Sequence, residues 1–232
     1  MTKRESWTKT GTMALGIVGA ALAAWAGPSD LNARVRADFP GTRAKWVHYA
    51  VPAMSNVQRL PDAYPADGAP GGTNRIVLAR GEYEPASILL YAFEDLGKVQ
   101  LTVGLLVNEH GDVFPSDGLD LKLVKCWYQN GNAWYSYFGD TGNTLVPELL
   151  LNDEDLIRVD TAAQANYARL VAADGTVREK GLNAPPKTEG RYDTEGRETF
   201  RPMTPEFRDA PSLRPVRLAK GEFRNFCLFR GL

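Results

Sequence analysis

The segment at residues 79–93 runs from a polar, turn-prone stretch directly into a strand that is apolar on both faces. Side chains alternate in direction along a strand. The two expected faces carry Ala86, Ile88, Leu90 and Ala92 on one side, and Leu89, Tyr91 and Phe93 on the other. A strand with no polar face has to be covered on both sides. The segment therefore predicts the middle of a layered β-domain.

The chain from residue 44 onward consists of short apolar stretches separated by Gly, Pro, Asn and Asp. The strands expected besides 86–93 are 45–51, 75–79, 99–107, 119–128, 145–151, 156–159, 165–172, 213–218 and 223–229. No window of ten or more residues keeps the apolar spacing of an amphipathic helix. This spacing of strands predicts an all-β fold, an antiparallel β-sandwich of the jelly-roll or immunoglobulin-like kind. Because the chain stops three residues after the last strand, we expect the sandwich to be incomplete at its C-terminus.

Residues 1–26 have the features of a signal peptide. Lys3, Arg4 and Lys9 give a positive start, residues 13–26 carry no charge, and Ala24-Trp25-Ala26 offers small residues at a cleavage site. The uncharged stretch is shorter than the roughly 20 residues that span a membrane. We therefore expect a secreted or periplasmic protein with no membrane attachment after cleavage, and an uncleaved anchor is the alternative.

The rest of the chain divides by composition. We interpret residues 27–43 as an N-terminal linker, 44–172 as the β-sandwich, 173–211 as a polar, Pro-rich excursion, and 212–232 as returning strands of a truncated sandwich. The formal net charge is −1. A nucleic-acid-binding protein would usually show a basic patch. Neither the charge nor its distribution indicates such a partner.

Two cysteines, Cys126 and Cys227, follow the predicted cleavage site. In an oxidising compartment they could form a disulfide that closes a loop of about 100 residues. Sequence spacing alone does not bring their Cα atoms within bonding range, so two separately buried thiols are the favoured alternative. Two cysteines are too few for a structural zinc site, and we expect no cofactor.

Few acidic residues are candidates for a catalytic or metal-binding site. Glu82 and Glu84 would share one face of a strand about 7 Å apart. A glycosidase pair flanks its substrate from opposite sides, so carboxylates at the start of a strand are the favoured reading. The acidic turn at 153–155 could contribute to a calcium site, although a solvated turn is favoured. With only His48 and His110 present and no nucleophile motif, we expect no catalysis by this chain alone.

Aromatic residues gather around a polar turn near the middle of the chain. The cluster comprises Trp127, Tyr128, Trp134, Tyr135, Tyr137 and Phe138. Aromatic faces beside polar turn residues are suited to stacking on sugar rings, and Trp134, Tyr135 and Tyr137 are the candidate carbohydrate-binding residues. The favoured alternative is that the cluster packs over one end of the sandwich.

Six short motifs follow one another in a fixed order. They are VPAMS at 51–55, RLPD at 59–62, GEYEPAS at 81–87, VKCWYQ at 124–129, LVPELL at 145–150 and LIRVD at 156–160. Together they resemble the N-terminal β-sandwich region of secreted bacterial glycoside-hydrolase-like proteins related to glycoside hydrolase family 123. The resemblance covers residues 44–171 and, weakly, 212–229.

In such proteins the sandwich precedes a (β/α)₈ barrel that carries the catalytic Asp-Glu pair. This sequence has no counterpart of the barrel. The resemblance implies a non-catalytic module that supports a missing C-terminal barrel domain and has a carbohydrate as its ligand. One alternative is a stand-alone carbohydrate-binding or cell-surface adhesion module. Another is a small hydrolase that uses Glu82, Glu84 or Glu148.

Overall fold

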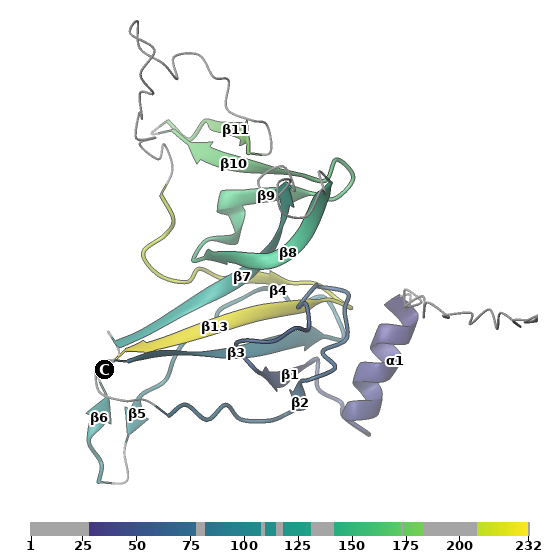
Figure 1. Cartoon of the computed structure of the whole chain (residues 1–232), viewed down its shortest axis with the longest axis vertical. Helices are drawn as coiled ribbons and strands as arrows, with labels where there is room; N and C mark the ends of the chain where they lie inside the picture. Colours follow the sequence, from purple (N-terminus) through teal and green to yellow (C-terminus); the bar gives the residue numbers. More distant parts are fainter. Residues whose placement is uncertain are drawn as a thin grey trace, which may run out of the picture.

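The computed structural model describes residues 28–77, 82–107, 110–114, 118–130, 142–172, 174–182 and 208–231. Figure 1 shows one helix and a set of β-strands arranged in layers. The elements are α1 (Pro28–Asp38), β1 (Trp46–Val51), β2 (Ala69–Pro70), β3 (Tyr83–Ala92), β4 (Gly97–Val99), β5 (Leu106–Val107), β6 (Val113–Phe114), β7 (Leu119–Asn130), β8 (Asn143–Leu151), a 3₁₀ turn (Glu154–Leu156), β9 (Ile157–Asp160), β10 (Ala165–Val171), β11 (Val177–Gly181), β12 (Val216–Leu218) and β13 (Phe223–Gly231).

A six-stranded sheet forms the centre of the molecule, in the order β2-β1-β3-β13-β7-β8. Every neighbouring pair in it is antiparallel. The remaining strands form a three-stranded sheet, β11-β10-β9, and two pairs, β12-β4 and β5-β6. The prediction of an all-β, antiparallel, sandwich-like fold is confirmed.

Both faces of β3 are buried, as the sequence of residues 86–93 predicts. On one face, Leu89 and Tyr91 pack in a cluster with Leu31 and Val35 of α1. On the other face, Leu90 packs in a second cluster with residues of β12 and of the segment that precedes it. The helix thus covers one side of the central sheet and the β12-β4 pair covers the other (Figure 1).

The prediction of a linker at 27–43 is wrong for most of its length, because residues 28–38 form α1. Leu31 and Val35 are its buried contacts, one helical turn apart. An apolar stripe this short falls below the length at which periodicity predicts a helix, and packing against the sheet stabilises it instead. Asp38 at the end of α1 accepts hydrogen bonds from the hydroxyls of Tyr49 (2.6 Å) and Tyr64 (2.7 Å).

We expect Tyr49→Phe to lower the free energy of unfolding by about 1.5 kcal/mol, the usual range for a hydrogen bond to a charged group. The ring would still fill its fully buried place, and only the contact with Asp38 would be lost. Urea denaturation measures the change. Tyr64→Phe removes the same kind of hydrogen bond from a more exposed ring, so it should lower the free energy of unfolding by less. An equal or larger loss for Tyr64→Phe would contradict this assignment.

Two expected strands differ in the structure. Residues 75–77 lie outside any strand, and residues 78–79 fall outside the described part. The expected strand at 99–107 is broken: β4 ends at Val99, β5 begins at Leu106, and the chain between them is irregular. Val99 and Leu101 pack against the second core cluster, but Leu105 is 77 % exposed, so the apolar face of this pattern ends partway along it.

The boundary predicted at residue 172 falls inside a hairpin. Val171 of β10 pairs with Val177 of β11, so the sheet continues into the predicted excursion. The excursion's residues 183–207 and the predicted signal peptide, residues 1–26, lie outside the described residues.

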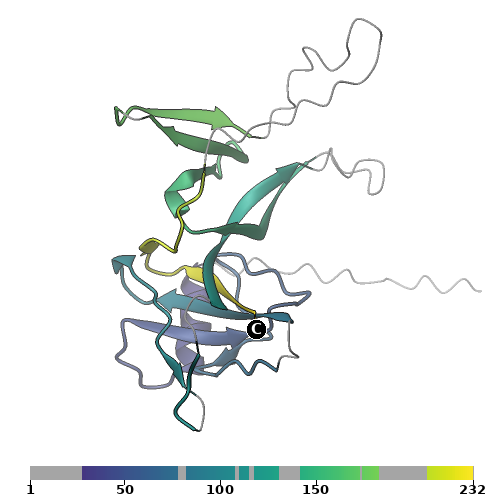
Figure 2. The same cartoon turned by 90° about the vertical axis from the view of Figure 1, so that its left-hand side faces the viewer.

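A second layer extends from the central sheet on β7 and β8. Pairing between β7 and β13 spans only residues 119–124 of β7, whereas β8 accompanies β7 to its end. Figures 1 and 2 show the two strands leaving the central sheet and leading to the β9-β10-β11 sheet. Leu151, Ile157 and Ala168 form the buried cluster of this second layer.

Candidate ligand site

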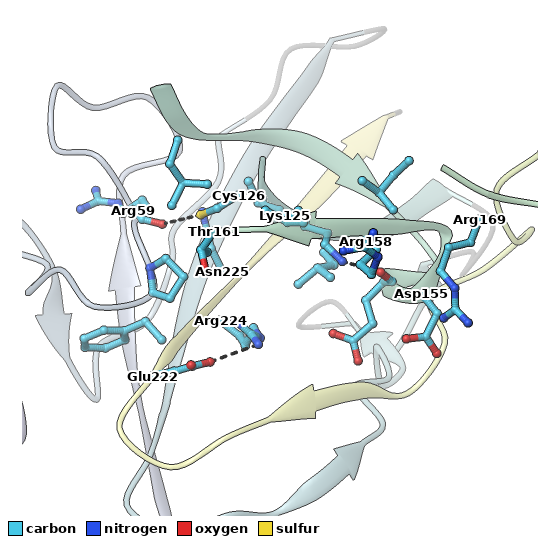
Figure 3. A pocket seen from close by; sticks show the side chains of 18 residues that line it. Arg59, Lys125, Cys126, Asp155, Arg158, Thr161, Arg169, Glu222, Arg224 and Asn225 are labelled. Carbon is cyan, nitrogen blue, oxygen red and sulfur yellow. Dashed lines mark hydrogen bonds and ion pairs between the residues drawn. The ribbon is translucent and has the colours of Figure 1, made fainter. Parts of the chain in front are cut away.

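A pocket of about 470 Å³ lies at the point where β7 separates from β13 (Figure 3). The last register pair between the two strands is Val124↔Asn225. The pairing of β7 with β8 shifts between Lys125 and Cys126. The extra residue is Glu148 of β8. A bulge bends and twists the strand pair locally, and a gap opens beside the start of β13 where β7 and β8 turn away together. We call this gap the wedge pocket.

Residues from both faces of the central sheet line the wedge pocket, because it lies between two diverging strands. Its charged lining consists of Arg59, Lys125, Arg158, Arg169 and Arg224 with Glu154, Asp155 and Glu222. Arg59 forms a two-point ion pair with Asp67, including a contact of 2.7 Å from Nη2. Arg158 is held by Glu179 at 2.7 Å. The cations not engaged in these two pairs are Lys125, Arg169 and Arg224.

Lys125 is the partly buried cation of the wedge pocket. Its Nζ donates a 2.5 Å hydrogen bond to the backbone carbonyl of Glu154. Burial lowers the pKa of Lys125, the nearby Glu154 carboxylate acts in the opposite direction, and the positive charge of Arg224 lowers the pKa further.

Arg224 lies at the start of β13. Its Nη2 contacts Glu222 at 3.2 Å, and its Nε donates to the backbone carbonyl of Arg217 at 3.1 Å. Both contacts fix the direction of the guanidinium. Its next neighbour along β13, Asn225, is only 8 % exposed, and the Oδ1 of Asn225 has no hydrogen-bond donor among the described residues.

The two cysteines are free thiols in the structure. Cys227 pairs with Lys122 across the sheet, so Cys126 lies four residues further along β7. That separation is about 14 Å at the rise of a strand, and a disulfide needs Cα atoms within roughly 7 Å. The possible disulfide is therefore excluded, and the favoured interpretation of two separate thiols is the one that the structure shows.

Burial raises the pKa of both thiols, that of Cys126 to about 11. Cys126 Sγ donates to the carbonyl of Arg59 at 3.5 Å, and Cys227 accepts from Ser87 Oγ at 3.7 Å. A buried thiol of raised pKa is a poor nucleophile, so Cys126 contributes shape rather than reactivity to the wedge pocket.

The acidic turn at 153–155 is partly solvated, with the Asp155 side chain 54 % exposed, but it also has partners in the structure. Its side chains contact the opposite layer: Asp155 pairs with Lys98 of β4 at 2.9 Å, Asp153 with Arg214 at 2.9 Å, and Glu154 accepts from the backbone N–H of Arg217 at 2.6 Å. The turn therefore joins the second layer to the β12-β4 pair. Because Glu154 and Asp155 also line the wedge pocket, the same turn forms one of its walls.

The carboxylates proposed for a small hydrolase do not meet. Glu84 lies on β3 and Glu148 on β8, with β13 and β7 between them. Glu148 accepts a 2.5 Å hydrogen bond from Gln129, and Glu82 is exposed just before β3. None of the three lines the wedge pocket. The predicted stacking residues Trp134, Tyr135 and Tyr137 lie outside the described residues.

One feature of the sequence could have indicated the wedge pocket: a charged residue interrupts an otherwise apolar strand face. On β7, Leu119, Leu121 and Leu123 alternate as an apolar face, and Lys125 takes the next position of that face. A lysine in such a position indicates a change of surroundings. The divergence of β7 from β13, which creates the pocket, depends on contacts between distant parts of the chain.

Within the described residues, no helix has the length and apolar character needed to cross a membrane. The sequence matches no protein-family model, and searches of curated proteins and of solved structures return no match. The fold and the wedge pocket are therefore the basis for any functional assignment.

Proposed function

We propose that this chain is a non-catalytic β-sandwich module of a secreted, glycoside-hydrolase-like protein, which binds carbohydrate in the wedge pocket and supports a separate catalytic barrel. The wedge pocket is the observation that carries this proposal. Its volume of about 470 Å³ lies within the range of small-ligand sites, and its place between two layers of a fold is a common one for such sites. Its lining combines apolar residues with polar and charged ones, a mixture that suits the C–H faces and hydroxyl groups of a sugar.

The positions of the carboxylates favour binding over hydrolysis. A glycosidase holds its two carboxyl groups roughly 5 to 9.5 Å apart on either side of the scissile bond. Glu84 and Glu148 lie on strands three positions apart in the sheet, which is about 14 Å at the usual strand spacing. This arrangement supports a binding module rather than the small hydrolase.

A group of exposed apolar side chains supports the role of a partner for another domain. Tyr83, Leu105, Val107 and Val113 are between 55 and 77 % exposed. In Figure 1 the β5-β6 hairpin lies below the end of the sheet where β13 finishes. Gathered apolar residues on a surface are typical of contacts with another protein domain. A stand-alone carbohydrate-binding or adhesion module would use the same pocket but would have no need of this surface.

Affinity electrophoresis of the purified chain in gels that contain neutral or acidic polysaccharides tests the proposal. We expect retardation in at least one gel, and we expect Trp134→Ala to reduce it if the predicted stacking residues contribute. Migration unchanged in every gel would contradict carbohydrate binding. Release of sugars from a polysaccharide by the purified chain would contradict the non-catalytic role.

A further inference from the structure

Lys125 differs from other lysines, such as Lys98, in what its amine contacts. Lys98 pairs with the Asp155 carboxylate at 2.9 Å. Lys125 forms no such pair within the described part of the chain, and its Nζ donates to the backbone carbonyl of Glu154 at 2.5 Å. A carbonyl carries no net charge, so it favours the ammonium form less than a carboxylate does. The amine therefore lies in the wedge pocket without a carboxylate in direct contact.

The surroundings of this amine are partly apolar. The pocket lining includes the side chains of Leu123, Ile157, Val159 and Phe223. Lys125 is half-buried, and Figure 3 shows its side chain extending along the pocket toward the turn that carries Asp155. Loss of water disfavours a charged amine, and a lysine that is partly desolvated in an apolar pocket is a common form of nucleophile.

The charged groups around the amine act in opposite directions. Arg224 of β13 disfavours its ammonium form, and the three carboxylates of the turn at 153–155 favour it. Two further cations of the lining, Arg158 and Arg169, belong to the second layer. Burial is the largest of the causes, and the pKa of Lys125 is lowered. More of this amine is therefore neutral near physiological pH than of an exposed lysine, and only the neutral amine is a nucleophile.

We propose that Lys125 is a covalent binding site for small aldehydes, including the open-chain form of reducing sugars, which it holds in the wedge pocket as imines. The amine nitrogen adds to the aldehyde carbon, and one N–H proton moves to the aldehyde oxygen to give a carbinolamine. The hydroxyl group and the remaining N–H proton then leave as one molecule of water, and the C=N bond forms without an oxidant or a reductant. The inference goes beyond the proposed carbohydrate binding and does not depend on it.

Trapping of the imine on the whole chain tests the proposal. Glycolaldehyde is the probe, sodium cyanoborohydride reduces the imine to a stable amine, and peptide mass spectrometry measures the rate at each lysine. Lys220, which is exposed and lies outside the pocket, is the matched reference within the same molecule. At neutral pH we expect trapping at Lys125 to be about fivefold faster than at Lys220, since the rate follows the fraction of amine that is neutral. Raising the pH should then accelerate trapping at Lys220 more than at Lys125.

A variant and a denatured sample show whether the pocket causes the difference. Glu154→Gln removes a carboxylate that favours the ammonium form, so it should accelerate trapping at Lys125. Glu148→Gln, outside the pocket, should leave the rate unchanged. In denaturing urea the two lysines should react alike. Equal rates at neutral pH, matching pH profiles, or an advantage of Lys125 that persists in urea would each overturn the inference. Retardation in polysaccharide gels tests the proposed function separately.

Discussion

Asp67→Asn is expected to lower the free energy of unfolding by about 3 kcal/mol, the usual cost of leaving a buried charge without its partner. The Arg59 side chain is only 6 % exposed, and both of its terminal nitrogens contact the Asp67 carboxylate. Ser55 Oγ donates to the same carboxylate at 2.5 Å. An asparagine would keep the shape but not the charge. Urea denaturation followed by circular dichroism measures the loss.

The double variant Arg59→Met, Asp67→Asn is the control, because it removes both charges and should recover most of the stability. A loss below about 1 kcal/mol in Asp67→Asn, or no recovery in the double variant, would contradict a buried ion pair.

Acid provides an independent test of the same pair. The hydrogen bond from Arg59 is the main cause that lowers the pKa of Asp67 from 3.8 to about 2. A carboxyl whose pKa is lower in the folded than in the unfolded state stabilises the fold above the unfolded value. Its contribution is then lost as the pH falls from about 4 through about 2. We therefore expect the wild-type protein to lose stability over this range by more than Asp67→Asn does.

The centre of the fold could be predicted from sequence because one strand carries the information locally. Leu89 and Leu90 are adjacent and both apolar, so both faces of β3 had to be covered whatever the topology. The position of β13 between β3 and β7 could not be predicted in this way. It depends on pairing between residues such as Ser87 and Cys227, which are 140 positions apart in the chain.

The wedge pocket was harder to predict than the sheet for the same reason. Lys125 interrupts an apolar face of β7, which is a local signal, but its neighbour Arg224 comes from a strand at the other end of the chain. The acidic turn at 153–155 looked solvated because Lys98 and Arg214, which pair with it, are also distant in sequence. Local patterns predicted the strands, and long-range pairing decided where their charged residues meet.

Asn166→Leu is expected to destabilise the second layer by about 3 kcal/mol, since it leaves two buried backbone groups without partners. Asn166 is 1 % exposed on β10. Its Oδ1 accepts from the backbone N–H of Tyr128 at 2.9 Å, and its Nδ2 donates to the carbonyl of Tyr128 at 2.5 Å. Beyond Val124, β13 no longer pairs with β7. There the Asn166 side chain makes the hydrogen bonds to the Tyr128 backbone that a neighbouring strand would otherwise make. Leucine has a similar size but offers neither group.

Hydrogen exchange and urea denaturation together measure the effect, with the Tyr128 amide and the amides of β10 expected to exchange faster in Asn166→Leu. Asn143→Ala is the matched control, because it removes an amide hydrogen bond to Gln164 on the exposed side of the same layer and should cost less than about 0.5 kcal/mol. A Tyr128 amide as protected in Asn166→Leu as in the wild type would mean that β7 is held in place by other contacts.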